Sequence, residues 1–457
     1  MNEKVERTKG FVYIVGITGA LAGLLFGLDT GIISGALPFI TSAFSLSVKE
    51  SEAIVTAVLI GAVLGTIISG FVSRRLGRHF AIWASAFIFC GGALLCAFAV
   101  NLYMLVIARL ILGIAIGLTS FTAPLYLSEV SPKHLRGSMI ATFQFMITVG
   151  ILVSYITDTI FTPSGSWRWM FGVTFFPAFI LFLAVLTLPK SPRWLVLVGR
   201  KEEARHVLGR VRNADEIDSE LNEIEAALSK TISVQELLTS KLFLKVLLLG
   251  IVLQAIQQFS GINTVIYYAP TIFKLAGFAS PIQQMWATVL VGTVNMLTTI
   301  IAIVYVDKWG RKPILYFGLT ITTVSLTLLG YLFTIGTHTE VSQYAAVLLV
   351  LLFIFGFAVS LGPIIWILCA EIFPLKGRDV GVGVTTATNW ICNAIVGGTF
   401  LTLVTNFGPT ATFGIFAGIG FLSLLFTINF VPETKDVSLE QIEANLLANK
   451  NLRDLGA

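Results

Sequence analysis

The feature that most constrains this chain is a series of long apolar stretches that runs along nearly all of its 457 residues. Each stretch holds roughly 20 or more mostly apolar residues, the length that a helix needs to cross the ~30 Å hydrocarbon core of a bilayer. Only 12% of the residues are Asp, Glu, Lys or Arg, about half the share found in an ordinary soluble domain. The sequence therefore predicts an all-α integral membrane protein. It excludes a soluble enzyme, a secreted scaffold and a nucleic-acid-binding protein.

Twelve such stretches predict twelve transmembrane helices, and one long polar segment divides them six and six. We expect an N-terminal six-helix half over 1–188, a cytoplasmic helical linker over 189–243, a C-terminal half over 244–431 and a cytoplasmic tail over 432–457. The predicted spans lie at 11–34, 54–73, 80–100, 102–122, 139–161, 167–188, 244–272, 285–306, 314–335, 343–370, 380–404 and 409–431.

The two polar segments also carry helix signals. Ile217, Leu221, Ile224 and Leu228 form a narrow apolar stripe at helical spacing in the linker. Ser438-x-x-Gln441 is a capping box that predicts a short helix in the tail. These features indicate a helical cover or connector rather than a catalytic domain.

The positions of Lys and Arg predict which way the chain crosses the membrane. With both termini cytoplasmic, the inside segments hold 26 of the 30 Lys and Arg residues. The outside segments hold Lys49, Arg168 and Lys274, and Arg109 lies within a span. Because cytoplasmic loops carry the excess of basic residues in membrane proteins, we expect both termini inside.

Three charged motifs occur twice, in the same order and at nearly constant spacing. This pattern predicts a duplicated chain whose halves are related by an axis along the membrane normal. The pairs are Arg75-Leu-Gly-Arg78 with Lys308-Trp-Gly-Arg311, Glu129-x6-Arg136 with Glu371-x6-Arg378, and Pro189-Lys-Ser-Pro-Arg193 with Pro432-Glu-Thr-Lys435.

The first span combines a ladder of small residues with one buried charge. Glycine recurs at every fourth position from Gly19 to Gly35, which lets a neighbouring helix approach closely. Asp29 should point away from that contact, toward a polar cavity. Such a group costs several kcal/mol unless it is paired or solvated, and Arg109 is the natural counter-ion. We expect Asp158, nearer the outer end of the fifth span, to be solvated at the interface.

The seventh span is unusually rich in side-chain amides. Gln254, Gln257, Gln258 and Gly261 fall on one helix face, and Asn263 follows them. An amide both donates and accepts hydrogen bonds, as a sugar hydroxyl does, so the set favours a neutral polyhydroxylated ligand. For any single amide, a hydrogen bond between helices is an equally good account.

Pro363 lies inside the tenth predicted span. A proline there removes one helical hydrogen bond and permits bending. The sequence leaves a static kink and a moving gate open as alternatives.

At this level of detail the sequence resembles the sugar porter family of the major facilitator superfamily, and within it the bacterial symporters that couple galactose or xylose to protons. The resemblance covers nearly the whole chain. Its motifs are Phe26-Gly-Leu-Asp29, Ala108-Arg109, Pro124-Leu-Tyr-Leu-Ser-Glu129, Pro189-Lys-Ser-Pro-Arg-Trp194, Gln257-Gln258-Phe-Ser-Gly-Ile-Asn263, Asp307-Lys-Trp-Gly-Arg-Lys312, Gly362-Pro363-x-x-Trp366 and Pro432-Glu-Thr-Lys435. Arg74 departs from the superfamily pattern, which has Asp at that position of the first-half loop.

The resemblance implies an alternating-access carrier with one central hexose site. Asp29 would be the proton-coupling carboxylate, with Arg109 as its partner. The residues implied to bind substrate are Phe26, Gln144, Gln257, Gln258, Asn263, Tyr267, Asn295, Gly362, Trp366, Asn389 and Trp390. Those implied to form cytoplasmic salt-bridge latches are Glu129, Arg136, Asp307, Arg311, Glu371 and Arg378.

The predicted function is therefore proton-coupled symport of a hexose, galactose or glucose, across a bacterial inner membrane. The predicted partners are the sugar, the proton and the lipid bilayer. No cofactor, metal or nucleic acid is expected, and the monomer is expected to function alone. Two alternatives stay open: a facilitative uniporter in which the Asp29–Arg109 pair is only structural, and a carrier whose main substrate is a pentose, xylose. A sugar sensor and a membrane enzyme are disfavoured because the sequence shows neither an added domain nor a catalytic cluster.

Overall fold

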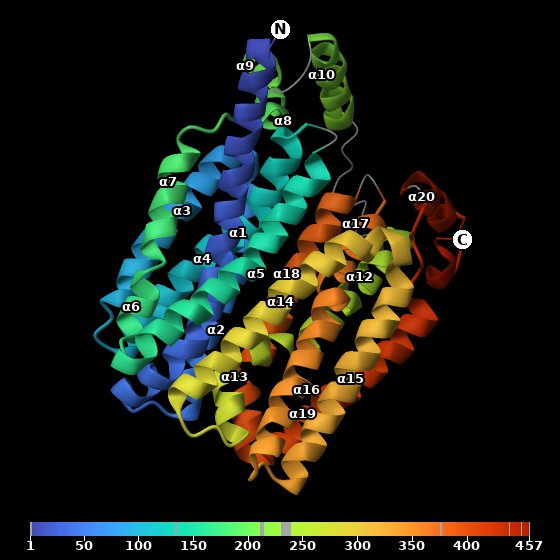
Figure 1. Ribbon diagram of the computed structural model, residues 1–457. Coiled ribbons are helices and arrows are strands. Elements are labelled where there is room, and N and C mark those ends of the chain that lie inside the picture. Colours follow the sequence, from blue (N-terminus) through green and yellow to red (C-terminus); the bar gives the residue numbers. More distant parts are fainter. Residues whose placement is uncertain are drawn as a thin grey trace. The chain divides into compact units, whose positions relative to one another are not determined.

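The computed structural model describes residues 2–132, 135–210, 214–229, 239–374, 377–437, 439–448 and 450–456, and the regular structure within them is entirely helical (Figure 1). The elements are α1 (Asn2–Phe44), α2 (Val48–Arg75), α3 (Arg78–Ala97), α4 (Leu102–Val130), α5 (Arg136–Phe161), η1 (Thr162–Ser164), α6 (Trp167–Gly172), α7 (Phe175–Val185), α8 (Pro192–Leu197), α9 (Lys201–Leu208), α10 (Ala214–Ser229), α12 (Lys241–Phe259), α13 (Ile262–Leu275), α14 (Pro281–Trp309), α15 (Arg311–Ile335), α16 (Glu340–Val359), α17 (Leu361–Glu371), α18 (Arg378–Gly397), α19 (Phe400–Phe430), α20 (Leu439–Leu447) and η2 (Leu452–Asp454).

The length and composition of these helices match a membrane protein. Within the described ranges, eleven helical segments are long and apolar enough to cross a bilayer. The one predicted span outside this set, 380–404, appears as α18, a 20-residue helix whose buried polar residues include Thr385 and Asn389. Because of these polar residues, α18 is not among the eleven segments counted as apolar enough to cross a bilayer. The predicted all-α fold is confirmed, and the helix count agrees with the predicted twelve.

Several predicted spans are broken into two helices, among them 167–188, which divides into α6 and α7. Two of the breaks lie in the predicted C-terminal half, 244–431. The predicted span 244–272 divides into α12 and α13 at Gly261, whose φ of 87° lies in the left-handed region that favours glycine. The predicted span 343–370 divides into α16 and α17 at Ser360. Pro363 follows three residues later and has no N–H to offer the carbonyl of Val359, so one helical hydrogen bond is missing at this break. Both breaks lie beside the buried amides.

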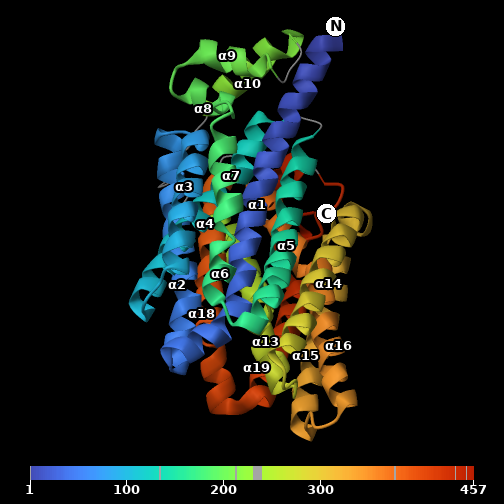
Figure 2. The ribbon, with the colours of Figure 1, turned by 60° about the vertical axis from the view of Figure 1, so that its left-hand side comes forward.

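The chain packs into two compact units. The first comprises Met1–Ile32, Ala57–Ser154 and Arg168–Thr231, and the second comprises Ile33–Thr56, Tyr155–Trp167 and Ile232–Ala457. In the first unit, α3 packs lengthwise against α4 and α7 (Figures 1 and 2). In the second, α15 packs against α16 and α19, and α12 packs against α18.

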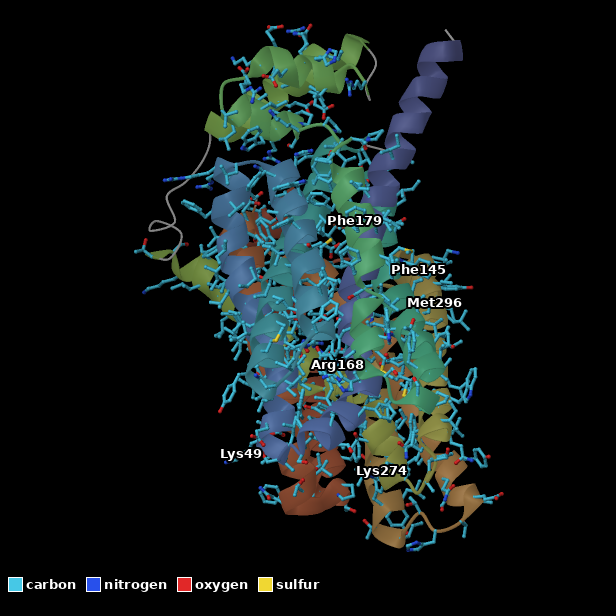
Figure 3. The ribbon with its side chains drawn as sticks, turned by 90° about the vertical axis from the view of Figure 1, so that its left-hand side faces the viewer. Lys49, Phe145, Arg168, Phe179, Lys274 and Met296 are labelled. Atoms are coloured by element: carbon cyan, nitrogen blue, oxygen red, sulfur yellow. The ribbon has the colours of Figure 1, made fainter. Side chains whose placement is uncertain are left out.

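The second unit also contains the C-terminal end of α1, the N-terminal end of α2 and the C-terminal end of α5. The Tyr155 hydroxyl on α5 donates to the carbonyl of Ile266 on α13 at 2.8 Å. Glu52 on α2 accepts from the backbone N–H of Thr402 on α19 at 2.7 Å. In Figure 3, Lys49 and Lys274 lie at the same end of this unit, as the predicted topology requires.

The glycine ladder of α1 packs directly on α5 within the first unit. A Cβ atom on Gly23 would lie 2.3 Å from the carbonyl oxygen of Phe143, and one on Gly27 would lie 2.0 Å from that of Ile147. These distances are far below van der Waals contact, so the backbones touch where a side chain would stand. The predicted packing role of the ladder is confirmed.

Gly27→Ala is therefore expected to destabilise the protein. The added methyl group must separate α1 from α5, and overpacking of this kind costs about 1–3 kcal/mol. Thermal unfolding in detergent should show a lower Tm than the wild type. Gly70→Ala on α2 is the control, because a Cβ there meets nothing within 4 Å. Equal Tm values for the two variants would contradict the packing account.

Helices α8, α9 and α10, from the predicted linker, form a small helical layer in the first unit (Figure 2). Helices α8, α9 and α10 enclose an apolar core that includes Trp194, Leu208 and Leu221, with Ile217 and Ile224 packed against it. The predicted stripe is thus confirmed for Ile217, Leu221 and Ile224. The side chain of Leu228 and the predicted capping residue Ser438 lie outside the described residues.

Candidate functional site

A buried ion pair joins α1 to α4 in the first unit. Arg109 Nη1 donates to Asp29 Oδ1 at 2.7 Å, and the two residues are only 1% and 3% exposed. The guanidinium also lies 5.6 Å from the centre of the Phe171 ring. The predicted partnership is therefore present. Asp29 was expected to face a polar cavity, but here it is enclosed by protein.

The pair is incompletely satisfied. Asp29 Oδ2 and Arg109 Nε are buried and have no hydrogen-bond partner among the described residues. Removing two charges from water costs several kcal/mol each, and their attraction compensates fully only when the remaining polar atoms are also bonded. The geometry suits a pair that can be separated by a change of charge, because a proton on Asp29 removes the attraction that holds Arg109.

Asp158 is a second buried carboxylate, and its predicted solvation at the interface is wrong. The residue is 0% exposed, and its Oδ2 accepts from the backbone N–H of Gly35 at 3.1 Å. Gly35 is the last step of the glycine ladder, so close approach of α1 to α5 buries the carboxyl. The described residues place no Lys or Arg in an ion pair with Asp158, which distinguishes it from Asp29.

In the second unit, the predicted amides form one connected hydrogen-bond network. Asn389 on α18 donates to Gln254 Oε1 at 2.6 Å and to Gln257 Oε1 at 2.7 Å. Its own Oδ1 accepts from Gln258 Nε2 at 3.0 Å, and Gln258 Oε1 in turn accepts from Asn263 at 2.5 Å. All five side chains are 8% exposed or less. Asn389 thus joins α18 to three amides of α12, and Gln258 connects these to Asn263 beyond the α12–α13 break.

The broken tenth span completes this network. Gln257 Nε2 donates to the carbonyl oxygens of Leu361 and Gly362, at 2.9 and 3.2 Å. Both carbonyls lie in the first turn of α17, directly after the break at Ser360. The Gly362-Pro363 motif therefore contributes backbone acceptors to the amide cluster, in addition to a bend.

A second, smaller polar pair lies one turn further along. Tyr267 on α13 and Asn393 on α18 are bonded through the tyrosine hydroxyl, with Asn393 Nδ2 donating at 3.1 Å. Asn393 was not predicted from the sequence. Gln254 was predicted as one of the seventh-span amides but not as a substrate-binding residue. The spacing of Asn393, four residues after Asn389 on one helix face, is the signal that could have found it.

The other residues predicted to bind substrate lie outside the hydrogen-bond network around Asn389. Asn295 on α14 and Trp390 on α18 are buried, whereas Trp366 on α17 is 37% exposed. Phe26 on α1 and Gln144 on α5 belong to the first unit, where Gln144 is exposed. Their contribution to a site stays a prediction.

The duplicated charged motifs form the same small cluster in each half. In the first, Arg78 Nη2 lies 2.9 Å from Glu129 Oε1, and Glu129 also accepts from the hydroxyl of Ser191. In the second, Arg311 Nη2 lies 2.8 Å from Glu371 Oε1, and the Thr434 hydroxyl donates to Glu371 at 2.5 Å.

These clusters partly match the predicted latches. Glu129, Arg311 and Glu371 take part, while Arg78 was not in the predicted set. Arg378 donates to the carbonyl of Phe373 at 3.4 Å. The side chains of Arg136 and Asp307 lie outside the described residues.

Long apolar helices, a buried ion pair inside the spans and a buried cluster of amides together define a polytopic membrane transporter. The family model for sugar (and other) transporters matches residues 15–446, and the chain belongs to this family.

Known relatives agree in length and fold. The galactose-proton symporter of Escherichia coli (strain K12) is 47% identical over 451 residues, covering 98% of this chain and 97% of the relative. The arabinose-proton symporter of the same strain is 43% identical over 454 residues, covering 98% and 96%. The xylose transporter of E. coli, in a partially occluded inward-open conformation, matches with a TM-score of 0.83 at 29% identity, covering 94% of this chain and 100% of that one.

Proposed function

We propose that this protein carries a hexose, galactose or glucose, together with a proton across a bacterial inner membrane by alternating access. The observation that carries the proposal is the presence of two distinct polar sites among the transmembrane helices of one chain. A buried Asp29–Arg109 pair can take up a proton. A buried amide network centred on Asn389 can bind a neutral polyol.

The amide network suits sugar hydroxyls because its members already hold one another in place. The side-chain oxygens of Gln254, Gln258 and Asn389 each accept one bond within the network and keep a second lone pair. A sugar hydroxyl can therefore donate to the cluster without leaving a buried partner unsatisfied. No side chain of the network is charged, which favours a neutral ligand over an acid or an amine. The strong similarity to a galactose-proton symporter supports a hexose.

Coupling follows from the charge of the ion pair. With Asp29 ionised, Arg109 is held at 2.7 Å on α4. With Asp29 protonated, the attraction is lost and α1 and α4 are free to adopt the other arrangement. Because a proton moves with an uncharged sugar, each cycle carries one positive charge. A membrane potential supplies about 2.3 kcal/mol per charge per 100 mV.

The remaining predictions form part of the same proposal. Both termini lie in the cytoplasm, the halves comprise residues 1–188 and 244–431, and a single chain completes the cycle. The clusters around Glu129 and Glu371 act as latches at the cytoplasmic ends of the spans. Their ion pairs stabilise one conformation of the carrier and must separate before the other conformation can form.

A counterflow assay tests the substrate class directly. Proteoliposomes loaded with galactose should take up labelled galactose from outside, and external D-glucose should compete more strongly than D-xylose or L-arabinose. Stronger competition by a pentose would reassign the substrate. An absence of counterflow with all four sugars would contradict a sugar carrier.

A further inference from the structure

Glu52, near the start of α2, is a buried carboxylate that belongs to neither of the two sites described above. It is 5% exposed, and Thr402 on α19 donates to both of its oxygens. The backbone N–H of Thr402 lies 2.7 Å from Glu52 Oε1, and the Thr402 hydroxyl lies 2.6 Å from Glu52 Oε2. The two residues are 350 positions apart in the sequence. Glu52 thus connects two helices that the predicted organisation assigns to opposite halves of the chain.

The start of α19 has no cap from its own helix. Thr399 at the N-cap provides no side-chain cap, and the first turn contains no acidic residue. The N–H groups of a first turn lack partners within the helix, and they form the positive end of its dipole. A carboxylate accepts from such groups more strongly than a neutral side chain does. Glu52 therefore caps α19 from another helix, and this stabilisation depends on the position of α2.

A second contact lies one turn further along α2. A Cβ atom on Gly398 would lie only 2.4 Å from Thr56 Oγ1, so the Thr56 hydroxyl stands where a side chain at position 398 would begin. Gly398 belongs to the two-residue connection between α18 and α19. All of these residues lie in the second unit, and Lys49 marks this end of α2 in Figure 3. Two successive turns of α2 thus pack on the start of α19 and the connection before it.

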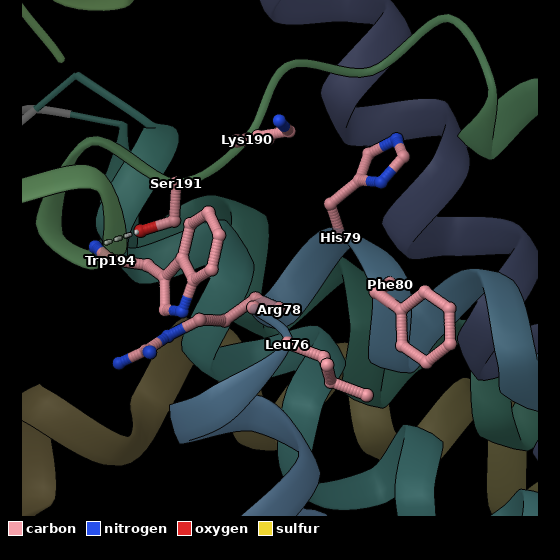
Figure 4. A pocket seen from close by; sticks show the side chains of 8 residues that line it. Leu76, Arg78, His79, Phe80, Lys190, Ser191 and Trp194 are labelled. Atoms are coloured by element: carbon pink, nitrogen blue, oxygen red, sulfur yellow. Dashed lines mark hydrogen bonds between the residues drawn. The ribbon is translucent and has the colours of Figure 1, made fainter. Parts of the chain in front are cut away.

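These contacts are remote from the charged cluster around Glu129. Arg78 and Ser191 of that cluster, shown in Figure 4, lie at the C-terminal end of α2, and the helix between Glu52 and Arg75 is about 35 Å long. The residues of α2 from Ala57 onward belong to the first unit. Because α2 is one continuous helix, a movement of the first unit relative to the second must strain or break the bonds between Glu52 and Thr402.

We propose that Glu52 is a positioning residue for transport, which stabilises the closed arrangement of this end of the spans by capping α19. When this end opens, the carboxylate leaves Thr402 and the start of α19 loses its cap in the same step. Both losses favour the closed arrangement. The inference rests on the alternating-access carrier proposed above, in which this end faces the outside.

The test uses the full chain with Thr56→Cys as a reporter, because position 56 packs against Gly398 in the closed arrangement. A membrane-impermeant maleimide is added to right-side-out vesicles, and labelling at position 56 is followed by peptide mass spectrometry. Glu52→Ala should raise the labelling rate about tenfold, because the closed arrangement loses a charge-assisted cap. Thr402→Ala removes one of the same bonds, so it should raise the rate less and add little to Glu52→Ala.

The matched control is Glu50→Ala in the same reporter background. Glu50 is an exposed carboxylate of the same helix that accepts from the backbone N–H of Ser47 at 2.8 Å, and its loss should leave the labelling rate unchanged. Equal labelling rates with and without Glu52→Ala would overturn the proposal. If Glu52→Ala does not fold, an unchanged rate in Thr402→Ala would overturn it in the same way.

Galactose counterflow, measured in the same vesicles, separates this inference from the proposed function. Labelling that rises in Glu52→Ala without any counterflow in the parent protein would contradict the sugar carrier and support the role of Glu52. Counterflow in the parent protein with labelling that does not respond to Glu52→Ala would support the carrier and overturn the role of Glu52.

Discussion

Replacing Asp29 by Asn is expected to abolish the accumulation of sugar against its gradient while leaving counterflow close to that of the wild type. In the wild type, Arg109 Nη1 donates to Asp29 Oδ1 at 2.7 Å. Asparagine has the same size, and its side-chain oxygen can still accept this hydrogen bond. It cannot take up a proton at any ordinary pH. The carrier should therefore run as a uniporter, with an accumulation ratio near one. The measurement is the steady-state ratio of labelled sugar in energised vesicles.

The matched control for this variant is Asp158→Asn. Asp158 is equally buried in a transmembrane helix, but it contacts the backbone N–H of Gly35 rather than an arginine. If coupling depends on the ion pair, Asp158→Asn should still accumulate sugar. Accumulation that survives in Asp29→Asn and is lost in Asp158→Asn would move the coupling site to α5. Accumulation in both variants would make the Asp29–Arg109 pair a structural feature alone.

Replacing Asn389 by Ala is expected to weaken sugar binding by at least about tenfold. The change removes the shared partner of Gln254, Gln257 and Gln258. Each buried polar group left unsatisfied costs about 1–3 kcal/mol, and 1.4 kcal/mol corresponds to a tenfold change in affinity. The KM for galactose counterflow should rise accordingly.

Two further variants are compared with Asn389→Ala by their KM for galactose counterflow. Asn393→Ala removes a residue that is bonded to Tyr267, and it should raise the KM less than Asn389→Ala. Asn429→Ala removes an exposed amide on α19 that bonds only within its own helix, and it should leave the KM unchanged. Equal KM values for the Asn389 and Asn429 variants would show that the network does not take part in binding sugar.

The sequence was sufficient to predict most of the fold because a membrane imposes a strong, local pattern. Long apolar stretches become helices, and the glycine ladder of α1 becomes a packing face against α5. The pairing of Asp29 with Arg109 was also predictable, because few charges occur within the spans and a buried charge requires a partner.

The parts that could not be predicted depend on long-range contacts or on backbone geometry. The break at Ser360 places the carbonyl of Leu361 within reach of Gln257, and only the three-dimensional arrangement shows this bond. The pairing of Arg78 with Glu129 crosses 51 positions of sequence and competes with other basic residues nearby. Asp158 appeared close enough to the end of its helix to be solvated, yet the fold buries it against Gly35.

The most direct test of the central claim is the movement of protons with sugar. One coupled proton can concentrate a neutral sugar roughly 50-fold per 100 mV of membrane potential. Galactose or glucose added to weakly buffered, de-energised vesicles should therefore raise the external pH as it enters. A protonophore should abolish this alkalinisation and, in energised vesicles, the accumulation of sugar. Sugar uptake without any change in external pH, together with accumulation that survives the protonophore, would contradict proton-coupled symport.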